Sequence, residues 1–157
     1  ESAVLGGAGN VINNLCALGA KVDVISVVGG CEISDELKKL LNKIKVDTQY
    51  LITQKDRITS KKSRIIAAQQ QVVRYDREST DKISSESQKQ ILAYFKDIIA
   101  NYDGVLLSDY GKGVLTFELT QALITLAKQH DKKVLIDPKG LDYSKYTGAY
   151  LLTQNEN

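Results

Sequence analysis

The chain opens with a regular order of helix and strand patterns. Apolar positions 11, 12, 15 and 18 recur at helical spacing, and Gly19 is typical of a residue just beyond a helix C-terminus. Residues 22–28 are β-branched and mostly apolar, which predicts a buried strand that Gly29-Gly30 ends. We expect Ser34 to cap a second helix, and we expect a short strand over residues 46–52. The apolar face of that helix comprises Leu37, Leu40, Leu41 and Ile44.

This order is interrupted at residues 57–78. The segments 61–68 and 72–77 are extended in character, and the polar stretch Gln69-Gln70-Gln71 joins them. The pattern predicts a β-hairpin that projects from the main sheet.

Regular alternation then returns. A helix is predicted to begin at Ser84 or Ser85, and another at Thr116 as its cap. Apolar strands are predicted over 105–107, 134–136 and 149–152. Strands that are apolar on both faces and alternate with helices are typical of a mostly parallel sheet covered on both sides. The sequence therefore predicts a three-layer α/β fold that occupies residues 1–157 as one domain.

Composition narrows the class of protein. The chain has 157 residues, of which 43% are apolar, and a formal net charge of +2. That charge is too small to indicate binding to nucleic acid or to a membrane, and no apolar run is long enough for a membrane span. Cys16 and Cys31 lack metal-ligand spacing, which favours a reduced, cytoplasmic protein. The chain contains no methionine, which fits a segment of a longer protein.

A glycine-rich segment, Gly6-Gly7-Ala8-Gly9-Asn10, runs directly into the first predicted helix. Its glycines allow close approach of a ligand, the helix offers N–H groups, and the amide of Asn10 can bind hydroxyls. The pattern indicates a cradle for a polyol or an anion, although a tight turn would look the same. It differs from a P-loop, and Ile12 stands where a dinucleotide fingerprint has its third glycine.

Polar residues follow three of the predicted strands. One strand leads into Ser108-Asp109-Tyr110-Gly111-Lys112-Gly113, the next into Asp137-Pro138-Lys139-Gly140, and the last into Thr153-Gln154-Asn155. In open α/β sheets, ligands bind beyond the carboxyl ends of the strands. Lysines suit phosphate, and carboxylates suit hydroxyls or hydrated magnesium, so a sugar or phosphate site is predicted here. Taken singly, the aspartates could be caps and the lysines could be solvated surface residues.

With these motifs placed, the chain resembles the ribokinase-like sugar kinases along essentially its whole length. The glycine spacing of the cradle, Gly19 and Gly29 is similar to the N-terminal pattern of that family, with Ile12 as a departure. The stretches 70–76, 107–113, 134–140 and 151–155 are most similar to the branch that phosphorylates D-glycero-β-D-manno-heptose 7-phosphate. The fold implied is a three-layer α/β/α sandwich with a β-hairpin lid.

The resemblance implies an ATP- and Mg²⁺-dependent transfer of phosphate to the anomeric hydroxyl of that heptose, in ADP-heptose and lipopolysaccharide core synthesis. It implies that Gly6, Gly7 and Asn10 hold sugar hydroxyls, and that Asp109 and Lys112 form the floor of the site. Other implied roles are phosphate binding by Arg64 and Arg74 on the lid, nucleotide binding by Lys139 and Asn155, and a homodimer formed through the lid hairpin.

Several parts of the family's pattern are not in this sequence. The strand that carries its substrate-binding aspartate would precede Glu1, and the Asn-x-x-Glu motif that begins at Asn155 stops at Asn157, one residue short of its glutamate. The family's Gly-Ala-Gly-Asp segment is absent too. Its general-base aspartate is expected beyond Asn157, so no catalytic residue is assigned.

We therefore expect these 157 residues to lack kinase turnover. The alternatives are a kinase for another sugar or sugar phosphate, and a non-catalytic module that self-associates.

Overall fold

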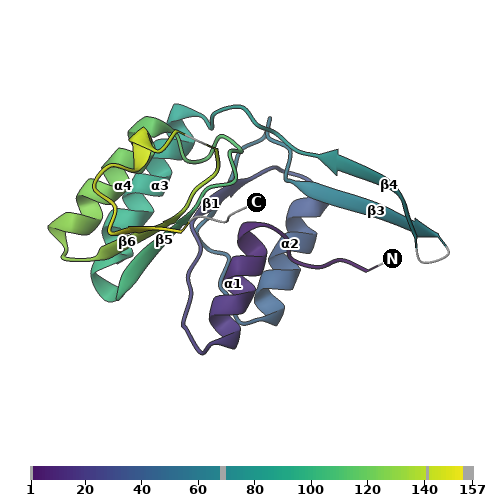
Figure 1. Cartoon of the computed structure of the whole chain (residues 1–157), viewed down its shortest axis with the longest axis horizontal. Coiled ribbons are helices and arrows are strands. Elements are labelled where there is room, and N and C mark those ends of the chain that lie inside the picture. Colours follow the sequence, from purple (N-terminus) through teal and green to yellow (C-terminus); the bar gives the residue numbers. More distant parts are fainter. Residues whose placement is uncertain (1, 68–69, 141, 154–157) are drawn as a thin grey trace.

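The computed structural model describes residues 2–67, 70–140 and 142–153. Its elements alternate as expected for an α/β protein (Figure 1). In order they are α1 (Ala8–Ala17), β1 (Ser26–Val28), α2 (Glu32–Lys43), β2 (Leu51–Thr53), β3 (Lys61–Ala67), β4 (Gln70–Arg77), α3 (Ser85–Ile98), β5 (Gly104–Ser108), α4 (Phe117–Gln129), β6 (Lys133–Asp137) and β7 (Leu151–Leu152), with single 3₁₀ turns at Ile99–Asn101 and Ser144–Tyr146.

The helix boundaries follow local signals in the sequence. The side chains of Ser84 and Thr116 accept hydrogen bonds from Ser87 N and Leu119 N, at 3.1 and 3.2 Å, and so cap α3 and α4 as predicted. Gly19 follows α1 with a φ of 89°, the left-handed conformation that favours glycine there.

Three predictions about the first third of the chain are wrong. The strand expected over 22–28 is confined to Ser26–Val28, and the strand expected over 46–52 is found at Leu51–Thr53, because in the described part of the chain these two short segments pair only with each other. The N-cap of α2 is Cys31, and Ser34 lies within the first turn of the helix. The Ser34 hydroxyl instead donates to Gly29 O at 2.5 Å.

The parallel strands form two separate ladders among the described residues. One pairs β1 with β2, and the other has the order β5-β6-β7; both are parallel, as predicted. Figure 1 shows α3 and α4 on one side of the strands and α1 and α2 on the other. The main core lies on the α3–α4 side, where Leu107, Val134 and Ile136 are buried against these helices.

The opposite face of this sheet is not closely covered. Leu106 and Leu151 point to that side in register with Leu135, and they are 37% and 49% exposed. Helix α1 has no buried residue. The predicted three-layer α/β/α order is confirmed, with this face of β5-β6-β7 covered less closely than the other.

The predicted hairpin is confirmed as an antiparallel pair of β3 and β4 that projects from the rest of the molecule (Figure 1). The expected turn is misplaced, because Gln70 and Gln71 belong to β4; Gln69 lies outside the described residues. A register shift between Ile65 and Ile66 interrupts the ladder. In the part of the chain that the structure describes, no helix has the length and apolar character needed to cross a membrane.

Candidate functional site

The glycine-rich segment forms a tight entry into α1. Gly7 occupies the N-cap position with a φ of 52°, a conformation that a residue with a side chain adopts only with strain. Within this turn, Gly9 N and Asn10 N donate to the carbonyls of Gly6 and Gly7, both at 3.0 Å. Two of the helix N–H groups are therefore already used, and the exposed Asn10 side chain is the group best placed to meet a ligand hydroxyl.

The loop after β5 lies against this cradle. An added Cβ on Gly7 would be 3.8 Å from the ring of Tyr110, so the ring lies close to this turn. On the other side of the loop, an added Cβ on Gly111 would be 3.4 Å from Cγ of Lys139, which follows β6. The pKa of Tyr110 is raised by burial and, to a smaller degree, by the carboxylate of Asp137. The structure thus brings together the cradle and the two strand ends predicted from the sequence.

Asp109 is at the floor of this arrangement but faces the protein. It is 5% exposed, and its Oδ1 accepts from Gly111 N at 2.8 Å. Its Oδ2 accepts from the Tyr146 hydroxyl at 2.7 Å and lies 2.5 Å from Nζ of Lys145. Both carboxylate oxygens therefore have partners in the chain, and Asp109 fixes the conformation of the loop. Its predicted contact with substrate stays a prediction.

Tyr146 has the largest change in acidity at this site. Burial and, next, the hydrogen bond to Asp109 raise its pKa far above the usual value. Lys145 and Tyr146 were not predicted from the sequence, because they lie in a 3₁₀ turn well after Asp109 and carry no motif. A Lys-Tyr pair gives no signal until the fold places it beside a buried carboxylate.

Removal of the Tyr146 hydroxyl is expected to change how the free energy of unfolding depends on pH. Because the folded-state pKa of Tyr146 is raised, its contribution to stability is complete below the pKa of an unfolded tyrosine, near 10, and is lost as the pH rises above it. Tyr146→Phe should lower the free energy of unfolding by about 2 kcal/mol at pH 8. The difference from the unmodified chain should shrink between pH 9.5 and about pH 11. Urea titrations across this range measure it, and a constant difference would contradict the assignment.

Lys112 is held at the base of the hairpin. Its Nζ lies 2.5 Å from Oε1 of Glu78, the residue after β4, and its carbonyl oxygen accepts from Nη2 of Arg57. Arg57 Nη1 also donates to the carbonyl oxygen of Asp81 at 3.0 Å. Arg57 is buried, and this burial lowers its pKa, an effect that Asp81 partly offsets. The loop after β5 is thereby joined to both arms of the hairpin.

A second set of contacts holds the hairpin to β1 and α2. Gly29 N donates to Oγ1 of Thr59 at 2.7 Å, and the hydroxyls of Thr59 and Ser34 are 2.7 Å apart. This hydroxyl network was missed because its members are far apart in the sequence. The one signal of this network in the sequence was Gly29. An added Cβ on Gly29 would lie 2.0 Å from Arg57 O, so only a glycine lets the two segments approach this closely.

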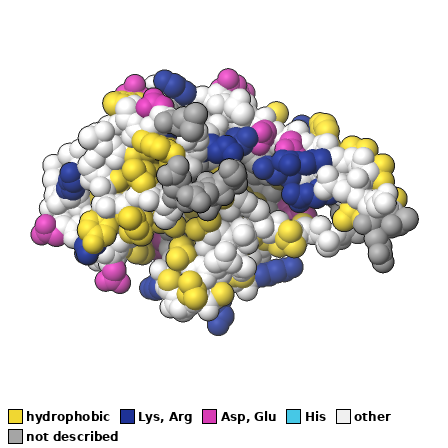
Figure 2. All heavy atoms as spheres, in the orientation of Figure 1, with side chains coloured by type: hydrophobic (Ala, Val, Ile, Leu, Met, Phe, Trp, Pro, Cys, Tyr) yellow, Lys and Arg dark blue, Asp and Glu magenta, His cyan; other side chains and the backbone are white. Residues whose placement is uncertain are grey.

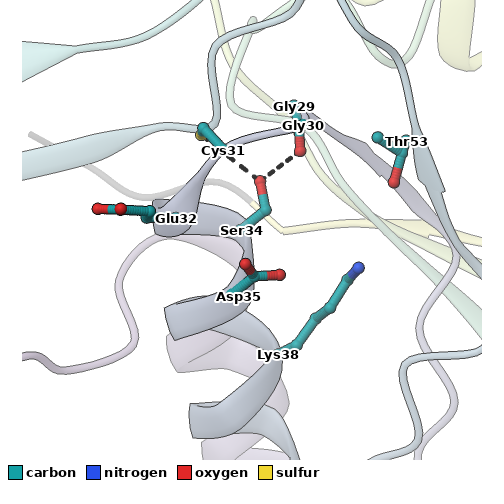
Figure 3. A pocket seen from close by; sticks show the side chains of 8 residues that line it. All are labelled: Gly29, Gly30, Cys31, Glu32, Ser34, Asp35, Lys38 and Thr53. Atoms are coloured by element: carbon teal, nitrogen blue, oxygen red, sulfur yellow. Dashed lines mark hydrogen bonds between the residues drawn. The ribbon is translucent and has the colours of Figure 1, made fainter.

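A cavity of about 500 Å³ opens beside this network, at the carboxyl ends of β1 and β2. Figure 3 shows the start of α2 on one side, with the Lys38 ammonium directed toward the opening. The Ser34 hydroxyl lowers the pKa of the Cys31 thiol, an effect that burial partly offsets and that backbone hydrogen bonds add to. The lining residues are Gly29, Gly30, Cys31, Glu32, Ser34, Asp35, Lys38 and Thr53.

The two predicted phosphate-binding arginines face each other on the hairpin. Arg64 and Arg74 are direct cross-strand partners, and Lys62 is opposite Asp76. Arg74 donates to Asp76 through Nε at 3.0 Å and Nη2 at 2.7 Å, and this contact, more than the nearby cations, lowers the pKa of Asp76. Figure 2 shows Lys and Arg side chains gathered over the base of the hairpin, next to acidic ones. Within the described residues, no hydrogen bond or ion pair joins these arginines to the cradle.

Two cofactors are implied by the family resemblance, ATP and Mg²⁺. An added Cβ on Gly111 would touch the Lys139 side chain, so the absence of a side chain at position 111 leaves room for Lys139. The nucleotide contact of Lys139 stays a prediction. Among residues 2–67, 70–140 and 142–153, no group of three His, Cys, Asp or Glu side chains could hold a metal ion. A magnesium site is therefore not assigned to these residues.

The part of the Asn-x-x-Glu motif that this sequence contains, residues 155–157, falls outside the described residues. This applies both to Asn155, the second predicted nucleotide contact, and to Asn157, beyond which the general-base aspartate was expected. The role of Asn155 and the position of the base beyond Asn157 therefore both stay predictions. Among the described residues, we assign no catalytic base.

The fold and this edge of polar loops define a class of protein: an open α/β domain whose polar loops gather at the carboxyl ends of its parallel strands, the edge where ligands bind in such folds. The family model described as "pfkB family carbohydrate kinase" matches residues 2–157 of the chain. The chain belongs to the pfkB family of carbohydrate kinases, and the family resemblance noted in the sequence is confirmed.

Two curated relatives named "Bifunctional protein HldE" are similar over nearly the whole chain. The one from Aliarcobacter butzleri (strain RM4018) is 59% identical over 156 residues, and the one from Helicobacter pylori (strain HPAG1) is 50% identical over 155. Each alignment covers 99% of this chain but only 33% and 34% of the relative. The chain therefore spans about one third of the length of these relatives.

Solved structures confirm the fold. The tetrameric inhibited form of phosphofructokinase-2 from Escherichia coli gives a TM-score of 0.67 at 18% identity, covering 90% of this chain and 45% of that one. A ribokinase II from E. coli, solved in complex with ATP and Mg²⁺, gives 0.59 at 16% identity, covering 84% of this chain and 42% of that one. At such identities the likeness concerns the fold alone.

Proposed function

We propose that the chain is the sugar-binding part of a kinase domain. The reaction is phosphorylation of the anomeric hydroxyl of D-glycero-β-D-manno-heptose 7-phosphate with ATP. It takes place in the cytoplasm and serves ADP-heptose and lipopolysaccharide core synthesis. The main support is the convergence of the cradle, the Asp109–Gly113 loop and Lys139 at one sheet edge. The relatives named HldE, at 50% and 59% identity, support the choice within the sugar kinases.

Each residue has a chemical part in this proposal. The amide of Asn10 and the turn at Gly6 and Gly7 bind sugar hydroxyls. Asp109 keeps the loop after β5 in place, and Lys112 offers a cation at the floor. ATP supplies the phosphoryl group when bound, with Lys139 directed to its phosphates. Phosphoryl transfer depends on positioned charge and on an oriented nucleophile. The general base that would orient the sugar hydroxyl belongs to the Gly-Ala-Gly-Asp segment, which is not in this sequence.

The guanidinium groups of Arg64 and Arg74 are the proposed phosphate ligands. Two arginines placed opposite each other repel unless an anion lies between them, and a phosphate monoester can accept from both. The carboxylate of Asp76 now offsets part of this charge. A phosphorylated sugar is therefore favoured over a free sugar, whether the sugar is the heptose or another.

Binding of the heptose phosphate by these 157 residues is the direct test. Isothermal titration should give a dissociation constant at least about tenfold lower for D-glycero-β-D-manno-heptose 7-phosphate than for the unphosphorylated heptose. Arg64→Gln should remove about tenfold of the affinity for the phosphate ester and leave that for the free sugar unchanged. ADP release with ATP present should remain at background.

The matched control is Lys89→Gln, which removes one positive charge on α3, an element outside the hairpin. Equal affinity for hexose 6-phosphates would favour a kinase for another sugar phosphate. Ordinary kinase turnover by the isolated chain would overturn the part of the proposal that assigns the general base to an absent motif.

The hairpin is also a proposed contact between two copies of the chain. Ile65 and Tyr75 lie on one face of it and are 61% and 63% exposed, and Val73 on the same face is exposed as well. Burial of such a face is favourable, and a second hairpin supplies a matching apolar surface. Light scattering that gives a dimer without any sugar-phosphate binding would favour the self-associating module over the kinase.

A further inference from the structure

The ammonium group of Lys112 is already paired with a carboxylate of the chain itself. Oε1 of Glu78 lies 2.5 Å from Nζ of Lys112, and the two side chains are 20% and 31% exposed. Partial burial weakens the screening of this pair by salt. Any phosphate that binds to Lys112 therefore competes with Glu78.

The other oxygen of Glu78 makes this pair incomplete. Oε2 is buried and, in the described part of the chain, has no hydrogen-bond partner. A buried carboxylate oxygen without a donor costs free energy, so the contact with Lys112 satisfies only half of the group. Displacement of Glu78 from Lys112 would let the carboxylate turn both oxygens to water.

The same arrangement occurs two residues earlier. Arg74 is paired with Asp76, and both lie in β4, so their side chains share one side of the strand; Glu78 follows directly after the strand. Asp76 and Glu78 thus each pair with a cation of the proposed site, Arg74 and Lys112 respectively. The Glu78 contact is the more informative of the two, because it joins residues that are 34 apart in the sequence.

Backbone contacts allow the side chains to exchange without opening the fold. Arg57 donates to the carbonyl oxygens of both Lys112 and Asp81. Ile83 N donates to Gly113 O at 3.0 Å. Because all three bonds end on main-chain carbonyl oxygens and none involves the Glu78 side chain, that side chain can leave Lys112 while the segments stay in place.

We propose that Glu78 is an internal occupant of the Lys112 anion site, displaced by a phosphate group when it binds, and that it thereby sets the affinity of the site for phosphate. This inference rests on the proposed function in one respect, the identity of the sugar that carries the phosphate group. Inorganic phosphate is therefore the probe, so that a failure of the heptose assignment is separate from a failure of this inference.

Glu78→Gln keeps the shape of the side chain and removes its charge. Isothermal titration with inorganic phosphate should give a dissociation constant about fivefold lower than that of the unmodified chain. Glu78→Asp, which withdraws the carboxylate by one methylene, should move it in the same direction by less. The matched control is Asp97→Asn, the same change of charge on an exposed residue near the far end of α3, which should leave the constant unchanged.

A double-mutant cycle identifies Lys112 as the cation concerned. In a Lys112→Gln background, Glu78→Gln should produce no gain in phosphate affinity. Retention of the gain in that background, an unchanged or weaker affinity in Glu78→Gln, or no phosphate binding by any variant would overturn the inference. Thermal melts of each variant establish that the compared proteins are folded.

Discussion

Gly113→Ala is expected to lower the free energy of unfolding by about 4 kcal/mol. Gly113 has a φ of 78°, where a side chain is strained, and an added Cβ would lie 2.0 Å from the carbonyl oxygen of Asp81. Relief of this clash requires movement of backbone, since the opposing atom is not the end of a flexible side chain. The same carbonyl oxygen accepts from Arg57, so the movement also disturbs the attachment of the hairpin.

Two other glycines separate the causes. Gly19 has a φ of 89° and open space around it, so Gly19→Ala should cost only the strain, about 1 kcal/mol. Gly29 has no positive φ, but its added Cβ would be 2.0 Å from Arg57 O, so Gly29→Ala should cost the clash alone, about 3 kcal/mol. Urea unfolding followed by circular dichroism measures all three. Equal losses for Gly19→Ala and Gly113→Ala would show that the close approach to Asp81 does not exist.

Such a loss would extend to the candidate site. The loop after β5 carries Lys112 and Gly113 in adjacent positions, and both contact the segments that begin and end the hairpin. The hairpin bears the proposed phosphate ligands, and the loop bears the cation at the floor. Their relative placement therefore depends on the close backbone contact that the absence of a side chain at position 113 permits.

Local signals predicted the helices well. Ser84 and Thr116 cap α3 and α4 because an N-cap depends on a hydroxyl and on the next three residues. The extent of β1 and β2 was overestimated because a strand continues only as far as a partner pairs with it, and the partner of Ser26 is the first residue of β2. Ser34 shows the same limit, since its hydroxyl is used by Gly29 and by Thr59, which is 25 residues away.

The candidate site was predicted in part. The strand-end rule brought Tyr110, Gly111 and Lys139 to one edge, because parallel strands share the direction of their carboxyl ends. The pattern could not tell a side chain that meets a ligand from one that supports the loop. Asp109 looked like a ligand for substrate, and only the fold shows that Lys145 and Tyr146 already surround it.

Asp109→Ala is expected to lower the free energy of unfolding by about 3–5 kcal/mol, because it removes one partner of a buried charged group. The substitution leaves three donors without their acceptor: Gly111 N, the Tyr146 hydroxyl and the Lys145 ammonium. Lys145 keeps one bond, to Leu115 O at 3.1 Å, and remains near the Tyr146 ring. Urea unfolding at pH 7 measures the loss.

Asp109→Asn separates charge from hydrogen bonding. The amide oxygen can still accept from one donor, while the amide nitrogen must face a second one, so a loss of about 2–3 kcal/mol is expected. Asp103→Asn, at an exposed carboxylate just before β5, has the same change of charge and should cost less than about 0.5 kcal/mol. If Asp109→Ala were as mild as this control while the affinity for the unphosphorylated heptose fell, Asp109 would be a ligand of the sugar hydroxyls after all. Lost stability is the expected result, because each oxygen of the Asp109 carboxylate already has a partner within the chain.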